Sequence, residues 1–125
     1  IDLHSCGISQ YILNEYLEDE EKYEKHLQEI RDDYEKKANF FCEQLDKYLP
    51  EFKYEKPKGG MFLYGSFEGI DSFALVQKCI EQKVVYVPGN QFYIDKVPNG
   101  EIRFNYTHST FEQIERGIKL IKNCL

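Results

Sequence analysis

The sequence predicts an α+β domain, in which a small, mostly antiparallel sheet carries helices on one face and a long amphipathic helix precedes it. Two observations lead to this prediction. Before Pro50, apolar residues recur at helical spacing, and after Pro50, short runs rich in Val, Ile, Phe and Tyr alternate with turn residues. The expected order is two helices, two strands, a helix, two strands and a final helix.

Two helices are expected before Pro50. Residues 9–17 suit a short helix, and the acidic run at 18–21 begins a long one, because carboxylates complement the positive end of a helix. An apolar stripe recurs along the long helix at Tyr23, Leu27, Ile30, Tyr34, Ala38, Phe41, Leu45 and Tyr48. Since the stripe covers only about three and a half heptads, we interpret it as an amphipathic helix along its own domain rather than a coiled coil.

The elements after Pro50 follow from alternation and turn chemistry. Four strands are expected at residues 52–54, 61–66, 84–87 and 102–106, with Pro88 ending the third and a loop over 90–100. Asp71 is the expected N-cap of a helix that carries Phe73, Leu75, Val76, Cys79 and Ile80. Ser109 and Glu112 match the capping box of a final helix whose apolar face carries Ile114, Ile118 and Ile121.

Composition excludes several classes of function. The 125 residues carry 22 acidic and 16 basic side chains, a net charge of -6, so a nucleic-acid partner is not expected. No apolar run approaches the roughly 20 residues of a membrane helix, and the start shows no signal peptide. The chain opens on Ile1 rather than Met, which suggests a piece of something longer. Four scattered cysteines favour reduced thiols and a cytoplasmic location.

Arg103 is the candidate binding residue. Side chains alternate along a strand, so Ile102 and Phe104 would face the helices while Arg103 and Asn105 face away from the core. A guanidinium inside an apolar strand is costly unless it meets an anion, although a surface ion pair is an equally good interpretation from spacing alone. The three histidines show no ligand-like spacing, so no metal site is expected.

Three blocks in order carry a resemblance to a known family. They are Gly-Gly-Met-Phe-Leu-Tyr at 59–64, Val-Pro-Gly with Phe-Tyr at 87–93, and Ile-Arg-Phe-Asn-Tyr at 102–106. Together they resemble the C-terminal small domain of fold-type I, pyridoxal-phosphate-dependent aminotransferases of class I/II. The branch that acts on 2-aminoadipate and aromatic amino acids is the most similar.

The resemblance implies roles for individual residues. Arg103 would bind the α-carboxylate of amino-acid and 2-oxo-acid substrates, with Asn105 near the site. His4 and Ser5 would approach the partner's active site in a homodimer, and residues 1–17 would lead in from the large domain. Pyridoxal phosphate and the lysine that carries it would belong mainly to that missing large domain. The chain would then hold no catalytic residue and be inactive when isolated.

Two alternatives stay open at this point. Bacterial transcription regulators of the GntR/MocR type join a DNA-binding head to an aminotransferase-like effector domain, and their C-terminal parts resemble this chain equally. A free-standing amino-acid-binding module would instead bury Arg103 at its own dimer interface. The sequence upstream of Ile1 distinguishes the regulator from the enzyme, and titration with amino acids distinguishes the module.

Overall fold

The computed structural model describes residues 6–94 and 99–125. The chain divides into two compact units, the first running to Asp33 and the second from Tyr34 to Leu125. The first unit contains helix α1 (Gly7–Leu17) and the beginning of helix α2 (Glu20–Tyr48). Both predicted N-terminal helices are therefore confirmed, and α1 begins two residues earlier than expected. The idea that residues 1–17 lead in from another domain stays a prediction.

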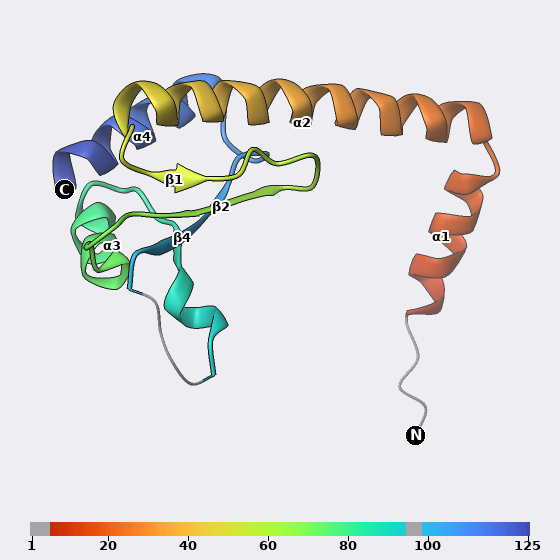
Figure 1. Ribbon diagram of the computed structural model, residues 1–125. Coiled ribbons are helices and arrows are strands. Elements are labelled where there is room, and N and C mark those ends of the chain that lie inside the picture. Colours follow the sequence, from red (N-terminus) through yellow and green to blue (C-terminus); the bar gives the residue numbers. More distant parts are fainter. Residues whose placement is uncertain (1–5, 95–98) are drawn as a thin grey trace. The chain divides into compact units, whose positions relative to one another are not determined.

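The second unit contains an antiparallel sheet that confirms the predicted α+β class. Among the described residues it has four strands in the order β1-β2-β4-β3, and every neighbouring pair is antiparallel. The strands and the remaining helices are β1 (Lys53–Tyr54), β2 (Phe62–Ser66), α3 (Ser72–Glu81), β3 (Val87–Pro88), the 3-10 helix η1 (Gly89–Phe92), β4 (Glu101–Asn105) and α4 (Phe111–Cys124). In Figure 1, the C-terminal half of α2 and helix α4 lie on the same side of the sheet.

The core lies between this face of the sheet and the helices. In β2 and β4, Leu63, Ile102 and Phe104 point into it. The helices supply buried side chains at Ala38, Phe41, Cys42, Leu45, Leu75, Val76, Cys79, Ile114, Ile118 and Ile121. Because every second strand residue is used for this core, the alternate residues of β2 and β4 are left on the opposite, open face.

Only the second half of α2 buries its apolar stripe. Ala38, Phe41 and Leu45 are buried, but Tyr23 and Ile30 are only half-buried. Within the second unit, the stripe therefore packs on its own domain, as the prediction of an amphipathic helix requires.

The third strand differs from its prediction. We expected residues 84–87 with Pro88 as the terminator, but β3 is Val87–Pro88, and Val85 is 76% exposed. Pro88 pairs with Ile102 at the edge of the sheet, where a missing N–H removes no bond to a further strand. The expected loop over 90–100 begins with η1, and residues 95–98 lie outside the description.

The observed N-caps of α3 and α4 can be compared with the predicted ones residue by residue. Asp71 is the N-cap of α3 and accepts hydrogen bonds from the backbone N–H groups of Phe73 (2.9 Å) and Ala74 (3.0 Å), as predicted. The capping box of α4 is formed by Thr110 and Gln113, one residue later than the predicted pair. Both pairs fit the Ser/Thr-x-x-Glu/Gln pattern, so the pattern alone does not choose between them.

The cysteines are free thiols at all four positions. Burial raises the pKa of the Cys42 thiol. Burial, with a smaller contribution from a hydrogen bond to Cys124, raises the pKa of Cys79 to about 12. These two side chains are therefore small apolar core residues near neutral pH. Within the described residues, no helix has the length and apolar character to cross a membrane, and no group of metal-binding side chains is found.

Candidate functional site

Strand β4 presents Arg103 on the open face of the sheet. Ile102 and Phe104 are buried, Arg103 is half-buried and Asn105 is exposed, which confirms the predicted alternation. Arg103 lies on an inner strand of the sheet. Tyr64 of β2 pairs with it on one side and Val87 of β3 on the other. The backbone around Arg103 is thus fixed by strands on both sides.

Two phenylalanine rings enclose the guanidinium of Arg103. Its Cζ lies 4.3 Å from the centre of the Phe62 ring and 4.7 Å from that of Phe92. Phe62 comes from β2, diagonally opposite Arg103, and Phe92 comes from η1. A cation this close to an aromatic face is attracted by the ring quadrupole. The two rings thus restrain the position of the guanidinium.

One nitrogen of this guanidinium lacks an acceptor. Arg103 Nε is buried and finds no hydrogen-bond partner within residues 6–94 and 99–125. A buried polar group without a partner is costly, and the cost is greater for a charged group. The two terminal nitrogens of Arg103 are not among the buried atoms that lack a partner, and such a pair can donate two parallel bonds to a carboxylate. This end of the guanidinium is therefore the part that could meet an anion supplied from outside the described residues.

An aromatic patch surrounds this position. We define it as four side chains, each between 40% and 46% exposed: Phe62, Tyr64, Phe92 and Tyr93. Exposed apolar groups clustered around a cation are typical of surfaces that bind a ligand or another domain. The patch lies on the open face, away from the core residues Leu63 and Ile102.

Glu101 is the acidic neighbour of Arg103 on the same face of β4. The Tyr64 hydroxyl donates a short hydrogen bond to Glu101 Oε2, and the Tyr93 hydroxyl donates to Oε1 at 3.1 Å. Burial and then the bond to Glu101 raise the pKa of Tyr64, while the bond to Glu101 is the main cause that raises the pKa of Tyr93. Both phenols thus stay protonated donors at neutral pH.

The other predicted site residues have different outcomes. Asn105 Oδ1 accepts from the Thr107 N–H (3.0 Å), the Thr107 hydroxyl (3.3 Å) and the His108 N–H (3.1 Å). Its carbonyl oxygen therefore caps the turn after β4, and a role of its amide N–H₂ near the site stays a prediction. His4 and Ser5 lie outside the described residues.

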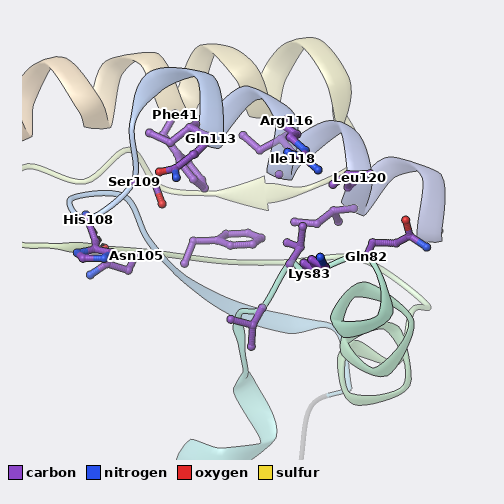
Figure 2. A pocket seen from close by; sticks show the side chains of 16 residues that line it. Phe41, Gln82, Lys83, Asn105, His108, Ser109, Gln113, Arg116, Ile118 and Leu120 are labelled. Atoms are coloured by element: carbon purple, nitrogen blue, oxygen red, sulfur yellow. Dashed lines mark hydrogen bonds between the residues drawn. The ribbon is translucent and has the colours of Figure 1, made fainter.

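A separate pocket of about 450 Å³ lies on the helix side of the sheet (Figure 2). Its wall includes core residues such as Phe41 and Ile118, and its polar side chains include Lys83, His108 and Arg116. Arg103 does not line this pocket. The concavity and the aromatic patch are therefore different features, and only the patch surrounds the candidate cation.

A family model described as aminotransferase class I and II matches residues 2–121. The chain belongs to this family. Among curated relatives, aromatic-amino-acid aminotransferase 1 of Thermococcus litoralis is 32% identical over 121 residues, which is 95% of this chain and 29% of the relative. The 2-aminoadipate transaminase of Thermus thermophilus is 29% identical over 126 residues, which is 99% of this chain and 31% of the relative.

Solved aminotransferase structures agree with this assignment. An α-aminoadipate aminotransferase from Thermus thermophilus, complexed with N-(5'-phosphopyridoxyl)-L-leucine, superimposes with a TM-score of 0.90 at 28% identity, over 99% of this chain and 32% of the other. An archaeal alanine:glyoxylate aminotransferase superimposes with a TM-score of 0.85 at 33% identity, over 98% of this chain and 31% of the other. The chain thus spans about a third of the length of its aminotransferase relatives.

Several residues around Arg103 were left unassigned from the sequence. Phe62 and Tyr64 alternate with the core residue Leu63, so the period of the strand already placed them on the face of Arg103. The sequence offered no such signal for Phe92, because η1 was expected to be loop. Glu101 is two residues before Arg103 and therefore shares its face, but its phenol partners depend on strand register and on the η1 turn.

Proposed function

We propose that this chain is the C-terminal small domain of a longer pyridoxal-phosphate-dependent aminotransferase, and that Arg103 binds the α-carboxylate of its substrates. The observation that carries the proposal is the Arg103 guanidinium, held between Phe62 and Phe92 with a buried Nε that lacks a partner among the described residues. Family membership supports the reaction class. Transamination moves an amino group from an amino acid to a 2-oxo acid.

The chemistry of Arg103 suits both substrates. An amino acid and a 2-oxo acid differ at the α-carbon but share a carboxylate beside it. A guanidinium fork binds that carboxylate through two parallel charge-assisted bonds, which fix its orientation as well as its position. Because the rings of Phe62 and Phe92 restrain the position of the guanidinium, less freedom is lost when the substrate binds.

The residues around Arg103 fit a substrate carboxylate better than the phosphate of the cofactor. A phosphate needs several donors, whereas Arg103 contacts two aromatic rings and the nearby phenols of Tyr64 and Tyr93 donate to Glu101. When bound, pyridoxal phosphate supplies the electron sink of the reaction. We assign its own contacts, and the lysine that carries it, to a large domain outside this chain.

The named relatives favour an enzyme over a regulator. They are called an aromatic-amino-acid aminotransferase and a 2-aminoadipate transaminase, so we propose a substrate of that group, with a 2-oxo acid as acceptor. We further propose a homodimeric, cytoplasmic protein without a nucleic-acid partner. Reading the sequence upstream of Ile1 tests the choice, because a basic DNA-binding head of about 70 residues would indicate a regulator instead.

Replacing Arg103 with lysine tests the role of the fork. In the full-length protein, Arg103→Lys keeps the positive charge but allows only one directed bond to the carboxylate. A lost charge-assisted bond is worth about 1.5–3 kcal/mol, so KM for both the amino acid and the 2-oxo acid should rise about 10- to 100-fold. Steady-state kinetics with each substrate varied in turn measure the effect.

The matched control is Arg116→Lys, an exposed arginine of α4 that lines the other pocket. It should leave both KM values within about twofold, because exposed charges of this kind contribute little. If Arg103→Lys behaves like the control in a folded, active enzyme, Arg103 does not bind the carboxylate. Absence of transamination in the wild-type full-length protein would refute the proposed reaction itself.

A further inference from the structure

Glu101 is positioned to compete with a substrate for Arg103. The two residues are two positions apart on the same face of β4, about 6.6 Å along the strand. Their long side chains can meet across that distance, and an ion pair would place a carboxylate on the fork before any substrate arrives. Yet within the described residues, Glu101 and Arg103 form no ion pair.

Two phenols occupy the carboxylate instead. Tyr64 donates to Oε2 and Tyr93 donates to Oε1, so each oxygen of Glu101 already accepts one hydrogen bond. Tyr64 reaches Glu101 diagonally across the sheet, since the backbone partner of Tyr64 is Arg103 and that of Glu101 is Ser66. Tyr93 approaches from the end of η1. Both oxygens of the carboxylate are thus engaged by phenols rather than by Arg103.

Gly89 makes room for this arrangement. A Cβ atom at position 89 would collide with the Glu101 side chain and lie 2.8 Å from the Tyr64 hydroxyl. The backbone of η1 therefore approaches the cluster more closely than any larger residue allows. The Tyr64 ring also meets Phe92 edge-on, with centres 6.2 Å apart, and Phe92 stacks on Arg103. Phe92 therefore contacts both Tyr64, which binds Glu101, and Arg103.

We propose that Tyr64 and Tyr93 hold the Glu101 carboxylate away from Arg103 and thereby keep the guanidinium free for the substrate. The two tyrosines are positioning residues, since they act on the substrate only through Glu101 and Arg103. The inference rests on the proposed function, because it takes Arg103 as the carboxylate-binding group. It assigns a role to the Val-Pro-Gly segment as well, whose glycine admits the cluster.

Removing both donors and then the competing charge tests this idea. In the full-length protein, Tyr64→Phe with Tyr93→Phe should raise KM for amino acid and 2-oxo acid by roughly twofold to fivefold, the upper range expected for a partly exposed ion pair. The change in kcat should be smaller. Adding Glu101→Gln to this double variant should return KM to near the wild-type value, because no charge is left to occupy Arg103.

The control is Tyr54→Phe, which removes a phenol of β1 that donates to Asp46 of α2 at 2.8 Å, outside the aromatic patch. It should leave KM unchanged. If the double tyrosine variant keeps the wild-type KM, or if Glu101→Gln fails to restore it, the proposal is wrong. A merely structural role of the tyrosines would not be rescued by removing a charge.

A crystal structure of the substrate-free double tyrosine variant gives a readout that does not depend on activity. Glu101 should then lie within 4.0 Å of the Arg103 guanidinium. A carboxylate that stays apart from Arg103 would overturn the inference. This outcome is separate from failure of the proposed function, which would appear as Arg103→Lys having no effect on KM in the otherwise wild-type enzyme.

Discussion

Replacing Phe62 or Phe92 with leucine in the full-length protein removes one aromatic face from Arg103 while keeping an apolar side chain of similar length. The rings lie 4.3 and 4.7 Å from the guanidinium carbon, well inside the ~6 Å range of a cation–π contact. Such contacts are worth about 0.5–1 kcal/mol when exposed and about 2 when desolvated. With Phe62 and Phe92 40% and 46% exposed, about 1 kcal/mol each is a reasonable value.

This magnitude converts into a measurable change. A loss of about 1 kcal/mol corresponds to about a fivefold rise in KM, which is an upper bound because the clamp acts only by orienting Arg103. In the double variant, KM should rise by less than the product of the two single increases, because both rings contact the same guanidinium. Steady-state kinetics with varied amino acid measure KM, and thermal unfolding checks that the fold is intact.

The control for this series is Phe73→Leu, an aromatic of α3 that is 50% exposed and, within the described part of the chain, makes no cation–π contact with Arg103. It should change KM by less than twofold. Wild-type KM values in both Phe62→Leu and Phe92→Leu, with unchanged unfolding temperatures, would show that the rings do not position the guanidinium. The argument for a restrained fork would then be refuted.

Two further predictions concern stability. Gly65→Ala should lower the free energy of unfolding by about 1–3 kcal/mol, because its Cβ would lie 2.5 Å from a backbone oxygen of β1 and 2.6 Å from the Phe52 ring. Urea unfolding measures this change, with Gly117→Ala as the control because a Cβ there meets nothing within 4 Å. Burial and the bond to Glu101 raise the pKa of Tyr64 above that of an unfolded tyrosine, so the stability it contributes is present below about pH 10 and is lost at higher pH. Tyr64→Phe should therefore flatten the alkaline decline in unfolding free energy, and an unchanged decline would contradict the assignment.

Alternation along the strands predicted which side chains share a face. It placed Arg103 opposite the core because Ile102 and Phe104 demand burial, and the structure confirms this. The same rule applied to β2 would have placed Phe62 on the open face. Alternation does not determine which residues of two strands pair with each other. The diagonal contacts from β2 to Arg103 and Glu101 therefore could not be predicted from the sequence.

The errors in the prediction occurred where local signals were nearly equivalent. Ser109 with Glu112 and Thr110 with Gln113 are both valid capping boxes, and the Asn105 turn, which ends at His108, precedes the cap that is used. The third strand does end at Pro88, which is its last residue at the sheet edge, but residues 84–86 are not part of it, contrary to expectation. In both cases tertiary structure, rather than local preference, decided the boundary.

The central claim is that Arg103 binds the substrate α-carboxylate, and a crystal structure of the full-length protein with bound amino acid or 2-oxo acid tests it most directly. We expect the two carboxylate oxygens to accept parallel bonds from the Arg103 fork at about 2.7–2.9 Å, with the guanidinium still between Phe62 and Phe92. A substrate carboxylate bound by another residue, with Arg103 paired to Glu101 instead, would contradict the claim.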